Sequence, residues 1–204
     1  MDETTKALIF LKLGGSLITH KDQPMSPRLD VIRRIMEEIS MTRKKNTGFQ
    51  IVLGHGSGSF GHYVGKKFNT RNGVKTQKDW AGFYQVYRAA RKLNELVITT
   101  AHQVNLPIIP FPICSNATVK SQNITSWNLT PLRSALEQGF IPLVYGDVAF
   151  DQQLGGTILS TEEIFDYLNA KLLPKRILLA GIEPGIWKDY PQNTTVINDI
   201  QAKA

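Results

Sequence analysis

The stretch Gly54–His62, with the sequence GHGSGSFGH, decides the fold class of this chain. It follows the apolar run Ile51–Leu53 and contains four glycines and two histidines within nine residues. A strand that ends in glycines exposes backbone N–H groups, which together with a following helix start can cradle an anionic oxygen. His62, at the end of the stretch, could hold or move a proton near neutral pH. Taken alone, a flexible Gly/Ser turn explains the pattern about equally well.

A second loop of the same kind, Lys12–Ser16 (KLGGS), favours the phosphate-binding interpretation. It follows the uninterrupted apolar run Ala7–Leu11, which is typical of a parallel strand buried on both faces. Lys12 should therefore emerge at the carboxyl end of that strand, where ligands bind in open α/β sheets. A lysine beside a Gly-Gly turn can neutralise a phosphate as a point charge, although a lysine that extends from a strand end into solvent looks the same.

Two common nucleotide-binding motifs are missing from the sequence. There is no G-x-x-x-x-G-K-[ST], and no clean G-x-G-x-x-G is followed by a ribose-binding acid at the required distance. The sequence therefore argues against a P-loop NTPase and against a Rossmann dinucleotide site.

Apolar strands alternate with helical patterns along the chain, which indicates a mostly parallel α/β sheet. Ser26 and Pro27 have the residue types of a helix N-cap and a first helical residue. The spacing predicts a long helix from Trp80 to His102, and prolines place the short strand 107–111 near a sheet edge or a strand end. The other predicted elements are a helix from Thr130 to Gly139, a strand Ile141–Tyr145, a hairpin over 149–158, a helix from a Ser160–Glu163 capping box to about Leu173, and a buried strand Ile177–Gly181.

The bulk properties are those of one globular domain. At 204 residues the chain can bury a sizeable core, and 42% hydrophobic with 20% charged residues is ordinary. No apolar stretch has the length of a membrane span, and residues 1–6 are too polar for a signal peptide. Cys114 is the only cysteine, so an intrachain disulfide and a cysteine-based zinc cluster are excluded. We therefore expect a cytoplasmic protein without a membrane partner.

The formal net charge of +7 raises the question of nucleic-acid binding. The basic residues are scattered, mostly on the polar faces of predicted helices, and no nucleic-acid motif accompanies them. A moderately basic surface also attracts small phosphorylated molecules. We therefore expect no nucleic-acid partner.

The two glycine loops, in this order, resemble those of the amino acid kinase superfamily. The resemblance rests on KLGGSLIT at 12–19 with Lys21, and on HGSGSFGH at 55–62, whose ending is similar to the isopentenyl phosphate kinase family. It covers essentially the whole chain. It implies an α/β, amino-acid-kinase-like αβα sandwich in a single domain, residues 1–204. The acceptor-binding part would be about 1–145, and the start of the nucleotide-binding part about 146–204.

The activity implied by this resemblance is ATP-dependent phosphorylation of isopentenyl phosphate to isopentenyl diphosphate, in an alternative mevalonate route of isoprenoid biosynthesis. Such a transfer needs in-line positioning and charge neutralisation rather than covalent chemistry. The implied ligands are isopentenyl phosphate, ATP and Mg²⁺ carried by ATP, with no metal site made by the protein alone. The resemblance also implies a homodimer, formed through the helix near Ser26 or the helix near Trp80.

The resemblance also implies roles for single residues. By motif position, Lys12 would hold the transferring phosphate, and Lys21 would assist from the other side. His62 would hold the acceptor phosphate as an orienting hydrogen-bond donor, because a phosphate oxygen is already nucleophilic near neutral pH. Asp147 would orient the lysines or contact Mg²⁺ through water, whereas His55 would be structural. Further substrate-binding candidates are Gly56, Ser57, Gly58 and Gly61, with Phe83 and Tyr84 as apolar candidates that could equally be core; nucleotide-binding candidates are Gly14, Gly15, Ser16, Glu162 and Gly185.

The chain departs from the family pattern in three places. Thr161–Glu163 stands where the family has Gly-Asp-Asp, although carboxylates there are also explained as partners of a helix N-terminus. Glu183–Gly185 replaces an Asp-Gly, which puts nucleotide affinity in question. The sequence ends at Ala204, where the family continues through a Gly-Gly-Met segment and another lysine, so the resemblance implies that a C-terminal part is missing.

These departures leave two alternatives open. The chain could be a family member that acts on another phosphate or phosphonate acceptor, or a non-catalytic phosphate-binding relative. The presence of both Lys12 and Lys21 favours catalysis, since a pure binding protein has less need of them.

Overall fold

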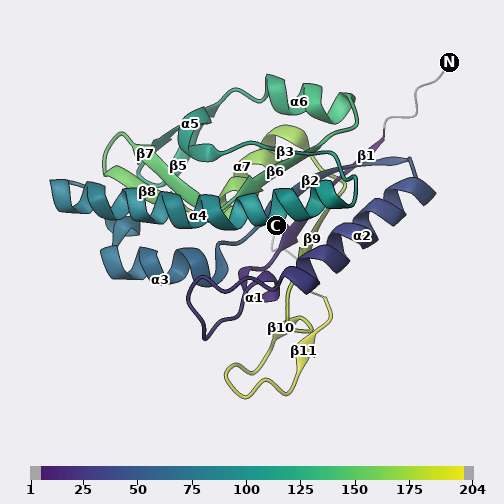
Figure 1. Cartoon of the computed structure of the whole chain (residues 1–204), viewed down its shortest axis with the longest axis horizontal. Helices are drawn as coiled ribbons and strands as arrows, with labels where there is room; N and C mark the ends of the chain where they lie inside the picture. Colours follow the sequence, from purple (N-terminus) through teal and green to yellow (C-terminus); the bar gives the residue numbers. More distant parts are fainter. Residues whose placement is uncertain (1–5, 200–204) are drawn as a thin grey trace.

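The centre of the molecule is a parallel five-stranded sheet (Figure 1), seen in a computed structural model that describes residues 6–199. Residues 1–5 and 200–204, which include most of the N-terminal segment considered above and the end at Ala204, lie outside the described residues. The strand order is β3 (Ile108–Pro110), β6 (Ile141–Tyr145), β2 (Phe49–His55), β1 (Ala7–Leu13) and β9 (Arg176–Ala180). Each neighbouring pair is parallel, so all five carboxyl ends lie at one edge of the sheet.

Helices cover both faces of this sheet. On one face, α2 (Leu29–Lys45) and α4 (Gln77–Gln103) pack against the odd-numbered side chains of β2. On the other face, α6 (Thr130–Glu137) and α7 (Thr161–Leu172) pack against Phe10, Val52 and Val144. Figure 1 shows α2 and α4 in front of the sheet and α7 behind it. The predicted α/β sandwich with a mostly parallel sheet is confirmed.

Short helices follow the strands that carry the two glycine loops. β1 leads through Gly14 into α1 (Gly15–Ile18), and β2 leads through Gly56 and Ser57 into α3 (Gly58–Phe68). A 3₁₀ turn at Thr70–Asn72 then connects α3 to α4. Both loops therefore lie at the carboxyl edge of the sheet, on neighbouring strands.

A second, four-stranded sheet extends the molecule beside α4. Its order is β5 (Asn123–Trp127), β4 (Ala117–Lys120), β7 (Asp147–Asp151) and β8 (Gly155–Leu159), with α5 (Ile113–Asn116) before β4. β7 and β8 form the predicted hairpin. The Asp151 carboxylate accepts hydrogen bonds from the backbone N–H groups of Ser121, Gln122, Gln153 and Leu154, which ties the β4–β5 turn to the β7–β8 turn.

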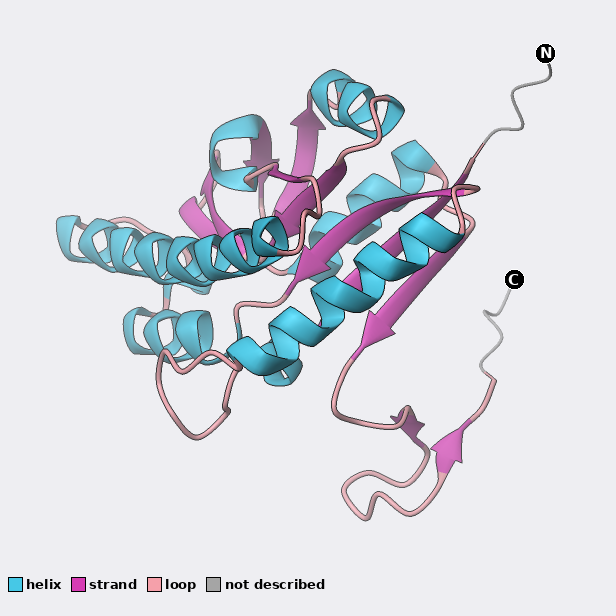
Figure 2. Ribbon diagram, turned by 45° about the vertical axis from the view of Figure 1, so that its right-hand side comes forward, coloured by secondary structure: helices cyan, strands magenta, loops and turns pink. Residues whose placement is uncertain are grey.

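The last central strand differs from the prediction. We expected a buried strand at Ile177–Gly181, but β9 is an edge strand, and the exposed fractions of Ile177, Leu178 and Leu179 are 42%, 44% and 69%. Among the described strands β9 pairs with β1 alone, and within residues 6–199 Ile177, Leu178 and Leu179 belong to none of the core clusters, whereas Ala180 packs against the cluster that contains residues of α2 and α4. Figure 2 shows the chain leaving this strand for a small hairpin, β10 (Ile186–Trp187) and β11 (Val196–Ile197), which stands apart from the main body.

The helix starts agree with the sequence signals to different degrees. The Ser160–Glu163 capping box starts α7, and Thr76 with Asp79 forms a second capping box that starts α4 three residues before Trp80. The prediction that Ser26 and Pro27 start a helix is wrong. α2 begins at Leu29, because Pro27 forms a bridge with Thr19 in the loop before it. None of the helices within residues 6–199 has the length and apolar character of a membrane span.

Candidate active site

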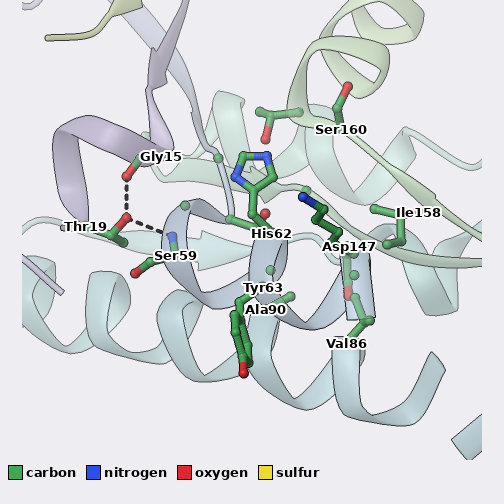
Figure 3. Close-up of a pocket in the computed structure, with 18 of the residues that line it drawn as sticks. Gly15, Thr19, Ser59, His62, Tyr63, Val86, Ala90, Asp147, Ile158 and Ser160 are labelled. Atoms are coloured by element: carbon green, nitrogen blue, oxygen red, sulfur yellow. Dashed lines mark hydrogen bonds between the residues drawn. The ribbon is translucent and has the colours of Figure 1, made fainter. Parts of the chain in front are cut away.

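A cavity of about 1050 Å³ opens at the carboxyl ends of β1, β2 and β6 (Figure 3). Both glycine loops line it, together with residues from α3, α4, β8 and α7. The residues predicted for the site that line this cavity are Lys12, Gly14, Gly15, Ser16, Lys21, Gly56, Ser57, Gly58, Gly61, His62, Asp147 and Glu162. The structure thus brings together groups that are up to 150 positions apart in the sequence.

The two glycine loops touch through their backbones. A methyl group added at Gly15 would lie 2.5 Å from the Gly58 nitrogen, and one added at Gly56 would lie 2.9 Å from the Gly15 nitrogen. Gly58 also has a φ of +48°, a left-handed conformation that favours glycine. The glycines therefore allow the loops to approach at a distance that side chains would prevent.

Two acidic residues of α7 pair with basic residues around the cavity. The Lys12 ammonium contacts the Glu162 carboxylate, and the Lys12 side chain is only 13% exposed. The Arg71 guanidinium binds Glu163 in a bidentate manner, at 2.7 and 3.3 Å, while Glu163 also caps its own helix. Glu162 is thus the α7 carboxylate that lines the cavity, whereas Glu163 holds the start of α7 and binds Arg71.

The two histidines of the GHGSGSFGH stretch have different environments. His62 is exposed, and its imidazole projects from α3 into the middle of the cavity, between the Gly15 loop and Ser160 (Figure 3). His55 is buried, and its ring stacks on Tyr145. The distance between its Nε2 and the Asn94 Oδ1 is 3.2 Å, which is a hydrogen bond. Burial lowers the pKa of His55, which keeps its ring neutral. The arrangement fits a structural role for His55 and makes His62 the histidine available to a ligand.

Asp147 is a buried acid with an unpaired oxygen. Its Oδ1 accepts a hydrogen bond from the Val148 N–H at 2.8 Å, whereas its Oδ2 has no hydrogen-bond partner in the structure. Burial raises the pKa of Asp147 to about 7, with the Val148 N–H, Tyr145 and Arg91 acting in the opposite direction. Within residues 6–199 no lysine forms an ion pair with Asp147, so the structure gives no contact through which it orients Lys12 or Lys21.

Three of the predicted residues lie away from the cavity. Phe83 is buried against Val86 and Val148, close to Gly156. It lies on α4 about one turn before Val86, the first residue of this helix that lines the cavity. Tyr84 faces solvent with 57% exposure. The apolar side of the cavity is instead formed by Val86, Ala90 and Ile158. Gly185 lies beyond β9, next to Val196 of β11.

Sequence reasoning missed several residues that line the cavity. Lys66 follows His62 by four positions on α3, a spacing that places both on one helix face and could have been noticed. Arg71 and Thr19 had no such signal, because their positions depend on the packing of distant segments.

The comparisons with known proteins agree with this geometry. The sequence profile of the amino acid kinase family matches residues 7–204. The isopentenyl phosphate kinase of Methanocaldococcus jannaschii is 30% identical over 188 residues, which cover 89% of this chain and 72% of that protein. The isopentenyl phosphate kinase of Methanothermobacter thermautotrophicus is 28% identical over 193 residues, which cover 91% of this chain and 71% of that protein.

Solved structures give the same result. A crystal structure of an isopentenyl phosphate kinase superimposes with a TM-score of 0.82 at 27% identity, covering 91% of this chain and 77% of that chain. The product complex of the Thermoplasma acidophilum isopentenyl phosphate kinase gives a TM-score of 0.79 at 27% identity, and the match covers 91% of this chain and 74% of that chain. Because the family profile spans nearly the whole chain, the chain belongs to the amino acid kinase family, in the group of proteins similar to isopentenyl phosphate kinases.

Proposed function

We propose that the protein transfers the γ-phosphoryl group of ATP to isopentenyl phosphate and so forms isopentenyl diphosphate and ADP, a step of isoprenoid biosynthesis in an alternative mevalonate route. The observation that carries the proposal is the backbone contact between the two glycine loops, inside a cavity that Lys12, Lys21 and His62 all line. The names of the similar proteins support the choice of acceptor.

The loop after β1 would bind the phosphates of ATP. The Gly14 N–H donates to the Ala180 carbonyl at 2.7 Å, so we assign phosphate binding to the backbone N–H groups of Gly15 and Ser16. Lys12 would neutralise the transferring phosphoryl group after exchanging its contact with Glu162 for one with phosphate. Lys21, on the loop between α1 and α2, would approach the same group from the other side.

The loop after β2 would bind the acceptor phosphate. The Gly56 N–H donates to the Leu13 carbonyl at 2.9 Å, so the backbone N–H groups of Ser57 and Gly58 are the ones left for a ligand. His62 would donate a hydrogen bond to the acceptor and orient it. An acceptor oxygen then bonds to the γ-phosphorus while the bond to the β–γ bridging oxygen breaks, and ADP leaves with the electron pair. A dianionic phosphate carries no proton on the attacking oxygen, so the step needs no general base.

Mg²⁺ fits this site as an ion held mainly by phosphate. Within residues 6–199 no three His, Cys, Asp or Glu residues are grouped as a metal site. Glu162 and Asp147 line the cavity and could accept hydrogen bonds from water bound to the ion. When bound, Mg²⁺ would neutralise negative charge on the phosphates of ATP.

Three further points belong to this proposal. An apolar side of the acceptor pocket was expected at Phe83 and Tyr84; we propose instead that Val86, Ala90 and Ile158, which line the cavity, contact the hydrocarbon part of the acceptor. We also propose a homodimer, which sedimentation analysis can test, and a cytoplasmic location, which cell fractionation can test.

Release of ADP from ATP, Mg²⁺ and isopentenyl phosphate tests the assignment of the residues. We expect Lys12→Ala and His62→Ala each to lower kcat/KM by about 10²–10³-fold, the usual effect of removing one group that stabilises transition-state charge. Lys120→Ala and His102→Ala are matched controls outside the cavity and should leave kcat/KM unchanged. Equal activity of the cavity variants and the controls would contradict the proposal.

A further inference from the structure

We infer that the hydroxyl group of Thr19 is a clamp that fixes the distance between the two phosphate-binding loops, and that Thr19 is thereby a positioning residue for phosphoryl transfer. This inference rests on the proposed function, because it concerns the alignment of two phosphate groups. Thr19 directly follows α1 as its C-cap and lines the cavity, but the residue is buried, with 1% exposure.

The Thr19 hydroxyl connects the two loops directly. It donates a hydrogen bond to the Gly15 carbonyl at 2.7 Å and accepts one from the Ser59 N–H at 2.9 Å (Figure 3). Gly15 belongs to the loop for ATP, and Ser59 follows the loop for the acceptor by one residue. A single oxygen atom therefore joins backbone groups from both loops, and a methyl group in its place could make neither bond.

The two loops approach each other closely around this hydroxyl. Gly15 and Gly58 carry no side chains that could interlock, and Gly58 lies directly under the Thr19 hydroxyl, where an added methyl group would be 2.2 Å from the oxygen. The glycines permit the contact, and the hydrogen bond from the Gly56 N–H to the Leu13 carbonyl joins the two strand ends at the base of the loops. The two hydrogen bonds of Thr19 add a second connection, between Gly15 and the start of α3.

The same connection also holds the segment that carries Lys21. The Met25 N–H donates to the Ser59 carbonyl, and the Ser26 N–H donates to the Ser59 Oγ, both at 3.3 Å. Residues 20–25 therefore form a strap that is attached to Ser59 at one end and continues from Thr19 at the other. Through Thr19 and Ser59, both loops and the strap with Lys21 share one anchor.

A simpler interpretation is that Thr19 only completes a local turn. Threonine often donates to the carbonyl four residues earlier, as Thr42 and Thr100 also do in this structure. Thr19 differs because it also accepts a hydrogen bond from the N–H of Ser59, which is 40 positions away at the start of α3, directly after the other loop. The two interpretations differ in their consequence, because only a clamp between the loops should affect the transfer step.

Steady-state kinetics of Thr19→Val, Thr19→Ser and Thr100→Val test the inference. Thr100 is the matched control, since it is buried and donates to the Leu96 carbonyl at 2.7 Å, outside the cavity. We expect Thr19→Val to lower kcat by about 10–100-fold, because a small misalignment of reacting groups has effects of this size, while both KM values change by less than about threefold. Thr19→Ser should restore most of kcat, and Thr100→Val should match the unaltered protein. Retention of kcat in Thr19→Val, or failure of Thr19→Ser to restore it, would overturn the inference.

Hydrogen exchange at the Ser59 amide provides a second test that does not depend on turnover. We expect slow exchange of this amide in the unaltered protein and in Thr19→Ser and Thr100→Val, and faster exchange in Thr19→Val. Fast exchange in the unaltered protein would overturn the inference even if Thr19→Val does not fold. If the unaltered protein does not phosphorylate isopentenyl phosphate, the proposed function fails, and the exchange of Ser59 decides on the clamp by itself.

Discussion

Asp147 shows how a single residue at the cavity can couple stability to pH. Its pKa is raised from 3.8 to about 7 because burial disfavours the charged carboxylate. Between these two values the folded protein holds a proton that the unfolded chain has released. The stability of the folded state should therefore fall as pH rises from about 4 to 7. Above pH 7 the carboxyl group is ionised in both states, and it causes no further loss of stability.

Substitution of Asp147 by asparagine, which does not titrate, should remove this loss of stability at high pH. We expect Asp147→Asn to be more stable than the unaltered protein at pH 8, by on the order of a few kcal/mol, and to lose most of that advantage at about pH 4, where the carboxyl group is largely protonated in both the folded and the unfolded state. Urea denaturation at both pH values measures the difference. Asp79→Asn is a control of opposite sign, since hydrogen bonds from Thr76 lower the pKa of Asp79, and its effect should be larger at pH 7 than at pH 3. A stability difference for Asp147→Asn that does not vary with pH would contradict the raised pKa.

At the same scale, the structure brings together the three side chains whose roles the family resemblance implied. Lys12, Lys21 and His62 all line the cavity, and their roles in catalysis stay predictions. Thr19 was missed, because a threonine after a Gly-Gly-Ser loop gives no sign that its hydroxyl reaches Ser59. Phe83 and Tyr84, the apolar candidates that could equally be core, do not line the cavity, because apolar residues on several sides of α4 do not show which part of the helix meets it.

At the scale of elements, local signals located some limits closely, although Ser26 and Pro27 misplaced the start of α2 and the capping box at Thr76 was not recognised. The Ser160–Glu163 capping box and the strand Ile141–Tyr145 were predicted within a residue or two of their limits. The strand β9 was predicted correctly as a strand but wrongly as a buried one. Its apolar run is typical of a strand covered on both faces, and only the arrangement of the other elements shows that its faces are accessible.

The exposure of β9 can be tested with two leucines of the same sheet. Leu179 in β9 is 69% exposed, whereas Leu143 in β6 is 0% exposed. We expect Leu179→Lys to change the free energy of unfolding by less than about 0.5 kcal/mol, as is usual for a surface substitution. Leu143→Lys should prevent stable folding, because it buries an unpaired charge. Urea denaturation and circular dichroism measure both effects, and strong destabilisation by Leu179→Lys would show that β9 is covered in solution.

At the scale of the whole molecule, charge should assist the capture of a phosphorylated acceptor. The chain has a formal net charge of +7, and Lys12, Lys21, Lys66 and Arg71 line one cavity. Salt screens such an attraction over about 10 Å at 0.1 M ionic strength. We expect the KM for isopentenyl phosphate to rise several-fold between about 0.05 and 0.5 M NaCl, with kcat nearly unchanged. Sucrose at matched osmolality should have no effect, and a KM that is independent of salt would argue against electrostatic capture.

The order of the strands and the meeting of the two loops are also properties of the whole molecule. Alternating strand and helix patterns predicted the parallel sheet, and the carboxyl-end rule for such sheets predicted that Lys12 emerges where ligands bind. The backbone contact between Gly15 and Gly58 could not be predicted, since it depends on the pairing of β1 with β2 in one particular register.

The most direct test of the central claim is ³¹P NMR of the unaltered protein with ATP, Mg²⁺ and isopentenyl phosphate. The proposed function predicts that the monophosphate resonance is replaced by the two resonances of a diphosphate, with ADP formed in equal amount. ATP hydrolysis to ADP and inorganic phosphate with the monophosphate intact, or no reaction at all, would contradict the assignment of isopentenyl phosphate as the acceptor.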